Sequence, residues 1–168
     1  MSKQFTAMAV MQLEEQGKLS YEDDITKYFP HIKFKNIRIK NLLRHTSGIP
    51  EFLAWDQQWI DKKKINTNQD FLKIIETKID STSFKPGDQY TYSNTNYLLL
   101  ALIVEKVSGQ SFASYMQQYI FKPAGMKTRL YFRRVHPMLT LKTTQKEWPM
   151  MPRPRASKVL MTFPHLAI

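Results

Sequence analysis

The amino-acid sequence predicts a mostly α-helical domain. Three apolar stretches, at 3–16, 97–107 and 112–121, have the composition and spacing of helices, and each is followed by a glycine or a proline that stops it. Residues 37–39 are the one candidate strand. The chain has 168 residues, of which 42% are hydrophobic and 23% charged, so its length and composition suit one globular domain.

The first predicted element is a helix over residues 3–16. Its apolar residues cover most of the helical circumference, which favours burial on nearly all sides, and Gly17 supplies a stop. A short helical turn then ends at Pro30, because proline disfavours helical geometry in the residue before it. Residues 37–39 predict a brief strand, and residues 41–45 predict a short helix that closes in the sequence Thr-Ser-Gly-Ile-Pro.

Three more elements follow. Thr67 or Asn68 is the expected cap of an amphipathic helix. A Pro-Gly turn precedes the segment 90–96, Tyr-Thr-Tyr-Ser-Asn-Thr-Asn, and a helix over 97–107 comes next. That helix is apolar on all faces, which is typical of a buried core element and not of a cofactor site. A serine caps the last predicted helix, over 112–121.

The composition changes near residue 132. Residues 132–168 contain five of the nine prolines, none of the five glycines, and seven Lys and Arg against one acidic residue. They show neither helical nor alternating periodicity. We therefore divide the chain into a domain at 1–131 and a basic, proline-rich tail at 132–168, which we expect to be irregular or the product of a shifted reading frame.

Composition also excludes several classes of site and partner. The chain has no cysteine, so disulfides and thiolate metal sites are excluded, and its four histidines lack metal-ligand spacing, so we expect no metal and no cofactor. The longest apolar run, 97–104, falls short of the ~20 residues of a membrane-spanning helix. The net charge of +11 suits a nucleic acid, but the basic tail has few aromatic residues among its charges, so we expect no nucleic-acid partner.

Four segments, in order, resemble those of one enzyme family. They are Ser-Lys-Gln-Phe-Thr-Ala at 2–7, Leu-Leu-Arg-His-Thr-Ser-Gly-Ile at 42–49, the stretch 84–97, and Gly-Met-Lys-Thr at 125–128. Their order and approximate spacing are similar to those of the serine β-lactamase and penicillin-binding-protein-like hydrolases, which include class C β-lactamases, D-alanyl-D-alanine carboxypeptidases and esterases. The resemblance implies a fragment of the α+β β-lactamase/transpeptidase-like fold that holds the helical region and lacks most of the antiparallel sheet.

The resemblance assigns roles to three residues. Lys3 matches the lysine of a Ser-x-x-Lys signature, in which the amine lies beside the serine on one helix face and assists its attack on a carbonyl. The serine itself would stand directly before Met1. Tyr92 and Asn94 match a Tyr-x-Asn motif, in which the phenol transfers a proton and the amide orients the substrate. The third motif, Lys-Thr-Gly or His-x-Gly, is missing, because Lys-Thr-Thr at 142–144 lacks the glycine.

Physical reasoning on the residues themselves adds two expectations. If residues 92–94 run extended, Tyr92 and Asn94 face one side and Ser93 faces the other, which leaves Ser93 third in line as a nucleophile. His45 lies close to Ser47 in the sequence, but near neighbours in the chain do not supply the third orienting group of a hydrolytic triad. We therefore interpret His45 as part of a structural turn.

The expected activity is that of a partial serine hydrolase. The resemblance implies a parent enzyme that forms and hydrolyses an acyl-enzyme with D-alanyl peptides, β-lactams or small esters. Without the nucleophile and the third motif, we expect the chain as written to be catalytically incomplete and its uncovered apolar helices to favour self-association.

Two alternatives remain open. They are a non-catalytic peptide-binding module and a binder of nucleic acid or anionic membranes through the basic tail. Family members usually work outside the cytoplasm, whereas this sequence shows no export signal and would stay in the cytoplasm if made as written.

Overall fold

The structure is a computed structural model that describes residues 3–61, 63–64 and 66–126. All of these lie in the first of two compact units, residues 1–137. The tail predicted at 132–168 and the Lys-Thr-Thr sequence at 142–144 lie outside the described residues.

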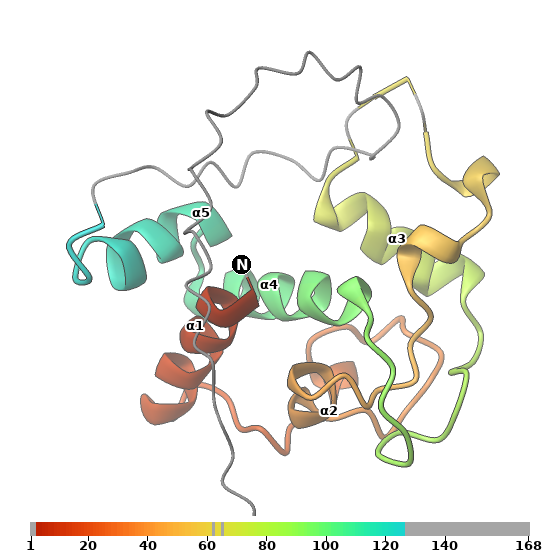
Figure 1. The fold of residues 1–168 in the computed structure, drawn as a ribbon, viewed down its shortest axis with the longest axis horizontal. Coiled ribbons are helices and arrows are strands. Elements are labelled where there is room, and N and C mark those ends of the chain that lie inside the picture. Colours follow the sequence, from red (N-terminus) through yellow and green to blue (C-terminus); the bar gives the residue numbers. More distant parts are fainter. Residues whose placement is uncertain (1–2, 62, 65, 127–168) are drawn as a thin grey trace, which may run out of the picture. The chain divides into compact units, whose positions relative to one another are not determined.

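The described part of the chain is mostly helical, as its sequence predicts (Figure 1). Short 3-10 turns lie between α1, α2 and α3, a π-helical segment follows α5, and no β-strand occurs among the described residues. The elements in order are α1 (Lys3–Glu15), η1 (Ile25–Lys27), α2 (Ile39–Leu43), η2 (Phe52–Ala54), η3 (Gln57–Trp59), α3 (Asn68–Lys78), α4 (Asn94–Ser108), α5 (Phe112–Tyr115) and η4 (Met116–Phe121).

The strand predicted at residues 37–39 is wrong. Arg38 forms one isolated antiparallel bridge with Asp24, and α2 begins at the next residue, Ile39. The apolar residues at 37 and 39 are both fully buried, so burial and not sheet pairing explains their pattern. Two isoleucines in so short a segment do not by themselves distinguish a β-strand from another buried segment.

Helix α4 is the central helix, in contact with α1, α2, α3 and α5. Every residue from Leu98 to Val104 is buried, which confirms the core helix predicted from its apolar sequence. Our expectation that this helix would be left partly uncovered is wrong, because the surrounding helices enclose it. α4 ends at Gly109, whose φ of +69° is readily adopted only by glycine.

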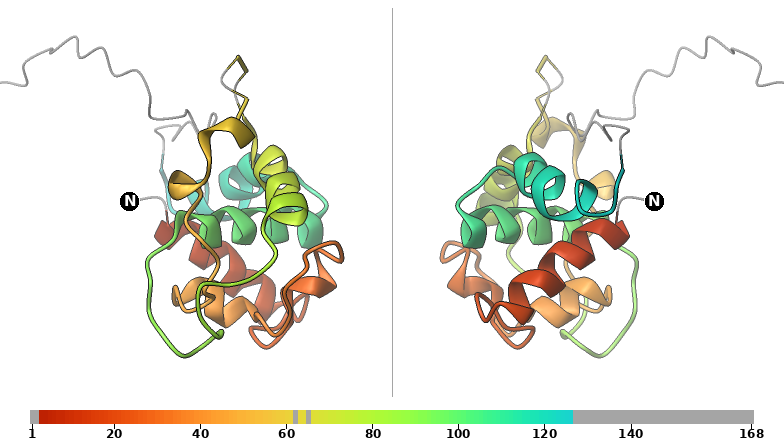
Figure 2. Two further views of the ribbon diagram at one scale, coloured as in Figure 1. Left: turned by 90° about the vertical axis from the view of Figure 1, so that its right-hand side faces the viewer. Right: turned by 90° about the vertical axis from the view of Figure 1, so that its left-hand side faces the viewer.

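Helix α1 has a buried face and an exposed face, so the prediction of burial on nearly all sides is wrong. Its buried residues are Thr6, Ala9, Val10 and Leu13. On the opposite face, Met8 and Met11 are 44% and 48% exposed. α1 packs on α4 and on η4, and the Phe5 ring meets the Phe121 ring edge-on with centroids 5.3 Å apart. Figure 2 shows α1 and η4 side by side.

The predicted caps of α3 and α5 are present. The Thr67 hydroxyl accepts a hydrogen bond from the Asp70 backbone N–H, and the Asp70 carboxylate accepts one from the Thr67 backbone, which is a capping box. The Ser111 hydroxyl caps α5 by accepting from the Ser114 backbone N–H. The helix predicted over 112–121 continues to Phe121, but its second part is π-helical.

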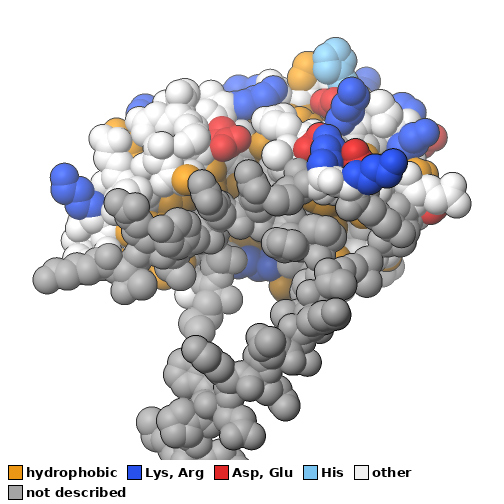
Figure 3. Space-filling view, turned by 90° about the horizontal axis from the view of Figure 1, so that it is seen from above, with side chains coloured by type: hydrophobic (Ala, Val, Ile, Leu, Met, Phe, Trp, Pro, Cys, Tyr) orange, Lys and Arg blue, Asp and Glu red, His pale blue; other side chains and the backbone are white. Residues whose placement is uncertain are grey.

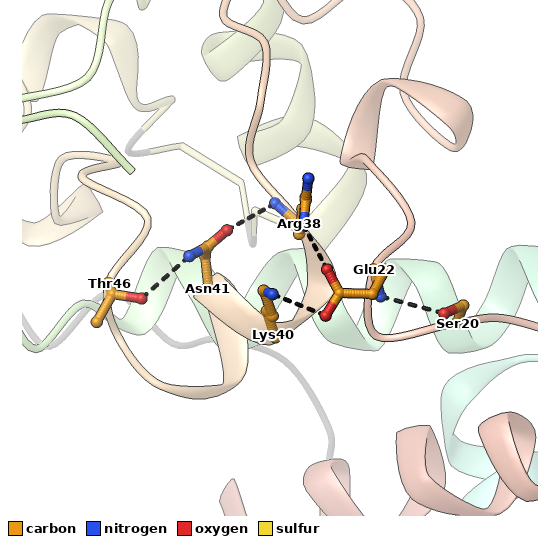
Figure 4. Close-up of polar contacts among 6 residues, drawn as sticks. All are labelled: Ser20, Glu22, Arg38, Lys40, Asn41 and Thr46. Atoms are coloured by element: carbon orange, nitrogen blue, oxygen red, sulfur yellow. Dashed lines mark hydrogen bonds and ion pairs between the residues drawn. The ribbon is translucent and has the colours of Figure 1, made fainter. Parts of the chain in front are cut away.

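Polar contacts around α2 fix the loop that leads to the site (Figure 4). The Glu22 carboxylate accepts hydrogen bonds from Arg38 at 2.5 Å and from Lys40 at 2.7 Å. The Asn41 side chain accepts from the Arg38 backbone at 2.9 Å and donates to the Thr46 hydroxyl at 3.3 Å. These contacts tie both ends of α2 to their neighbours and so set where the following loop, residues 44–50, begins.

Five surface ion pairs join oppositely charged side chains among the described residues. Figure 3 shows Lys and Arg side chains interspersed with Asp and Glu side chains on one face. Lys64 and Asp70 form one such ion pair, at 2.7 Å. Within the described residues, no helix is both long and apolar enough to cross a membrane.

Candidate active site

The side chains of Lys3, Tyr92 and Asn94 meet at one oxygen atom. The Lys3 ammonium donates a hydrogen bond to Asn94 Oδ1 at 2.6 Å, and the Tyr92 hydroxyl donates to the same oxygen at 3.2 Å. Lys3 begins the described part of α1, and Asn94 is the first residue of α4. The packing of α1 on α4 therefore brings together residues that are 91 positions apart.

The Lys3 ammonium also lies against two aromatic rings. Its Nζ atom is 4.8 Å from the centroid of the Tyr92 ring and 5.6 Å from that of Tyr97, distances at which a cation is attracted to an aromatic face. The Tyr97 hydroxyl donates to the Leu43 backbone carbonyl at 3.2 Å. Burial, and then the nearby Tyr92, raises the pKa of Tyr97, which keeps its phenol neutral. Tyr92 is instead 51% exposed, so its hydroxyl is open to a substrate.

Ser93 faces away from these side chains, as an extended backbone predicts. Its φ of −143° and ψ of 125° are extended, and the residue is 1% exposed. The Ser93 hydroxyl is buried without a hydrogen-bond partner among the described residues. A hydroxyl in this position is closed to substrate, so the geometry argues against Ser93 as a nucleophile.

His45 is a buried, neutral residue of this neighbourhood. Its Nδ1 atom accepts a hydrogen bond from the Ser93 backbone N–H at 3.2 Å and lies 3.3 Å from the Asn96 amide nitrogen. Because both neighbours are donors, we assign the ring proton to Nε2. Burial, and then the positive charge of Lys3, lowers the pKa of His45.

His45 and Ser47 bind to the same amide, that of Asn96. The Ser47 hydroxyl donates to Asn96 Oδ1 at 2.6 Å and accepts from the Ile49 backbone at 3.1 Å, while His45 contacts the other end of the Asn96 amide. The geometry is that of a structural turn held on α4, in line with our interpretation of His45.

The loop over residues 44–50 lies along residues 82–91. The His45 carbonyl accepts from the Thr91 backbone at 2.9 Å, and the Gly48 carbonyl accepts from the Ser83 backbone at 2.8 Å. Gly48 has a φ of +74°, and a Cβ atom there would lie 2.4 Å from the Phe84 carbonyl oxygen. Only glycine fits this close approach, which explains the glycine of the Thr-Ser-Gly-Ile sequence.

Sequence reasoning missed one residue of the site, Glu51. One of its carboxylate oxygens accepts a hydrogen bond from the Asn94 backbone N–H, and the other accepts from the Asn94 amide nitrogen at 3.2 Å. Glu51 follows the Gly-Ile-Pro turn directly. No periodicity or motif links it to Asn94, 43 positions later, so the sequence carries no signal of this contact.

Known proteins resemble this chain over most of its length. The model of the family described as Beta-lactamase matches residues 1–162. The chain is 43% identical to penicillin-binding protein 4* of Bacillus subtilis (strain 168) over 138 residues, which are 82% of this chain and 31% of that protein. It is 36% identical to Protein flp of Staphylococcus aureus (strain MW2) over 132 residues, 75% of this chain and 26% of that protein. The chain thus spans less than a third of these relatives.

Solved structures show the same likeness. The penicillin binding protein from Bacillus halodurans has a TM-score of 0.63 and 34% identity over 74% of this chain and 40% of that one. The D-amino acid amidase from Ochrobactrum anthropi SV3, complexed with D-phenylalanine, has a TM-score of 0.64 and 28% identity over 75% of this chain and 41% of that one. The helical arrangement described above is therefore one that these proteins share.

Proposed function

The chain belongs to the beta-lactamase family of serine hydrolases, and we propose that Lys3, Tyr92 and Asn94 form the proton-transfer half of its acyl-transfer site. One observation carries the proposal: Lys3 and Tyr92 both donate to Asn94 Oδ1. This shared acceptor holds an ammonium and a phenol side by side, on the solvent-accessible side of the α4 N-terminus.

The reaction needs a serine directly before Met1. On a helix such a serine lies three residues from Lys3 and shares its face. The step requires one proton fewer on the pair of Lys3 and Tyr92, so that Lys3 is an amine or Tyr92 a phenolate. As the serine oxygen attacks a carbonyl, the deprotonated group takes the serine proton, and Tyr92 then gives a proton to the leaving group as the acyl-enzyme forms. Water then cleaves the acyl-enzyme with the same groups acting in reverse. Asn94 Nδ2 has two hydrogens, one bound to Glu51, and the second is available to a substrate carbonyl.

The proposed substrates are D-alanyl peptides, β-lactams and small esters or amides. Two similar proteins are named as penicillin-binding, and one is named as a D-amino acid amidase, which supports an amide substrate with an amine leaving group. We propose an extracytoplasmic location for the complete enzyme, as the family resemblance implies.

The 168 residues themselves should turn over no substrate. Adjacent residues on a helix point about 100° apart, so a helical Ser2 would not share the face of Lys3. Ser93 is buried. Neither serine therefore replaces the nucleophile of the Ser-x-x-Lys signature.

Intact-mass measurement after incubation with benzylpenicillin tests this function. We expect no covalent adduct on the 168-residue chain. On a chain with a serine placed directly before Met1 we expect an adduct that forms slowly, because that chain still lacks the Lys-Thr-Gly or His-x-Gly motif. The matched control carries an alanine at that added position. An adduct on the 168-residue chain contradicts the predicted inactivity, and the absence of one on the serine-bearing chain argues against the acyl-transfer site.

A non-catalytic peptide-binding module is the second candidate. The observation that favours it is the hydrogen bond between exposed Tyr92 and half-buried Asn94. Saturable binding of a D-alanyl-D-alanine peptide, weakened by Asn94→Ala, is the expected result by calorimetry, and binding that Asn94→Ala leaves unchanged contradicts it.

The third candidate, a binder of nucleic acid or membranes, rests on tail residues outside the described part, so no structural observation favours it. We also propose that exposed Met8 and Met11 promote self-association.

A further inference from the structure

We propose that Glu51 is a positioning residue that orients the side-chain amide of Asn94, so that the amide oxygen faces Lys3 and Tyr92. The inference rests on the proposed function, because it concerns the same proton-transfer group. It adds a fourth residue, one that contacts neither Lys3 nor Tyr92 through its own hydrogen bonds and acts through Asn94.

The contacts of Glu51 make this orientation specific. Its carboxylate accepts from both nitrogens of Asn94, the backbone N–H at one oxygen and the side-chain Nδ2 at the other. An ionised carboxylate only accepts hydrogen bonds, whereas an amide has a donor end and an acceptor end. Glu51 therefore binds the nitrogen end of the Asn94 side chain. The oxygen end is left for the Lys3 ammonium at 2.6 Å.

The reversed amide would be unfavourable on both sides. Rotating the Asn94 amide by half a turn would place its NH2 group against the Lys3 ammonium and its oxygen against the Glu51 carboxylate. Donor would then face donor, and acceptor would face acceptor. In the observed orientation, hydrogen bonds join the Lys3 ammonium to the Asn94 amide and the Asn94 amide to the Glu51 carboxylate. In such a chain each hydrogen bond polarises the next.

The backbone around Glu51 holds the carboxylate in place. The Thr95 hydroxyl donates to the Pro50 carbonyl at 2.9 Å and accepts from the Phe52 backbone N–H at 2.9 Å. Residues on both sides of Glu51 are thus bound to the residue that follows Asn94. Glu51 also caps η2, because its Oε1 accepts from the Leu53 backbone N–H at 3.3 Å. A side chain anchored in this way has little freedom to follow a rotating amide.

Glu51→Gln makes a specific prediction about Asn94. The introduced glutamine has one carbonyl oxygen for three donors, which are the Asn94 backbone N–H, Asn94 Nδ2 and the Leu53 backbone N–H. When this oxygen stays with the Asn94 backbone N–H, the NH2 group of the glutamine faces the Asn94 side chain. That arrangement favours the reversed amide and removes the acceptor of Lys3. In nitrogen-15 NMR of the full chain, we expect hydrogen exchange of the Lys3 ammonium to accelerate about tenfold or more, as loss of a charge-assisted hydrogen bond implies.

Asp56→Asn is the matched control. Asp56 caps η3 by accepting from the Gln58 backbone N–H at 2.9 Å, in the way that Glu51 caps η2, but it lies outside the site. We expect this control to leave Lys3 exchange unchanged. Equal exchange in Glu51→Gln and the wild-type chain, or equal acceleration in the control, overturns the proposal.

A double variant tests the orientation directly. Asn94→Asp alone sets two carboxylates against each other and should lower the unfolding temperature. In the double variant with Glu51→Gln, the carboxylate at position 94 accepts a hydrogen bond from the glutamine NH2 group on one side and one from Lys3 on the other. The double variant should therefore restore slow Lys3 exchange and unfold at a higher temperature than Asn94→Asp.

Additive effects of the two substitutions, or an unfolded double variant, overturn the proposal. If Glu51→Gln does not fold, the double variant still decides. Because exchange is measured without substrate, failure of Glu51 as a positioning residue is distinguishable from failure of acyl transfer, which the benzylpenicillin adduct reports.

Discussion

The Lys3 ammonium lies 2.6 Å from the side-chain oxygen of Asn94, 91 residues further along the chain. This contact joins the N-terminal ends of the described α1 and of α4, and Tyr92 donates to the same oxygen. Asn94 accepts hydrogen bonds from the Lys3 ammonium and the Tyr92 hydroxyl and donates one to Glu51. Its substitution should therefore affect stability as well as function.

Asn94→Leu should destabilise the chain by about 1–3 kcal/mol, because it leaves the partly buried Lys3 and Glu51 groups without their partner. Urea unfolding measures the change. Asn68→Leu is the matched control, since Asn68 likewise begins a helix, α3, and is partly exposed. A loss no greater at Asn94 than at Asn68 contradicts the predicted network.

Lys3→Met should raise the pKa of His45. Burial is the main cause of the low pKa of His45, and the Lys3 charge is the second. Removing that charge should therefore return the pKa part of the way to its ordinary value. Glu51→Gln should lower the pKa of His45 further, because the negative charge of the Glu51 carboxylate raises that pKa in the wild-type chain. NMR titration of the imidazole protons measures both changes. Shifts in the same direction in the two variants would count against this electrostatic description.

Stability should fall as the pH drops below about 6.5, the ordinary pKa of histidine. The pKa of His45 is lower in the folded chain than in the unfolded chain, so the unfolded chain binds more protons between those two values. The stability contribution of His45 is thus fully present above about pH 6.5 and is lost as the pH falls toward the pKa of the folded state.

His45→Asn should flatten this pH dependence. Asparagine tolerates the His45 φ of +57° but does not titrate. Unfolding free energies measured at several pH values, with His31→Asn as the control at an exposed residue, provide the test. An equally steep pH dependence in His45→Asn would assign the effect to other groups.

Gly48→Ala should destabilise the chain more than Gly17→Ala does. Both glycines have positive φ, +74° and +66°, so both substitutions cost about 1 kcal/mol in backbone conformation. Only at Gly48 does the new Cβ atom also meet a backbone oxygen, that of Phe84 at 2.4 Å, whereas at Gly17 nothing lies within 4 Å. The difference between the losses of unfolding free energy in Gly48→Ala and Gly17→Ala measures the cost of the contact with the Phe84 oxygen. Equal losses would show that the loop moves to accept a side chain.

Replacing both Met8 and Met11 by glutamine should reduce self-association. The two residues are exposed on one face of α1, and glutamine keeps the helix propensity of methionine. Sedimentation velocity at several concentrations measures the effect. As the control, glutamine replaces Leu53, an apolar residue in η2 that is 56% exposed. If the wild-type chain does not associate, or if the control acts equally, the α1 face is not the cause.

Local signals predicted much of the helical structure. Thr67 marked the start of α3 because a hydroxyl cap is a short-range device. The apolar run after Tyr97 predicted a buried helix because no surface helix tolerates that composition. The start of α4 at Asn94, three residues earlier than predicted, depends on Glu51, which accepts from the Asn94 backbone. That contact is long-range and leaves no pattern in the chain.

The sequence also did not predict which face of α1 is buried. Its apolar residues lie on all sides, and sequence alone does not show which side another helix will cover. The structure covers the side of Ala9 and Leu13 and exposes Met8 and Met11. Similarly, the Tyr-x-Asn spacing placed Tyr92 and Asn94 on one side of an extended backbone, but their contact with Lys3 required the packing of α1 on α4.

We propose that Lys3 and Tyr92 transfer the proton in acyl transfer. The rate constant of acylation by benzylpenicillin, in a chain with a serine placed directly before Met1, tests this role. We predict that Lys3→Met and Tyr92→Phe each slow acylation by about a hundredfold or more, whereas Tyr90→Phe, at an exposed tyrosine two residues away, does not. Acylation at an unchanged rate in both variants would contradict the claim.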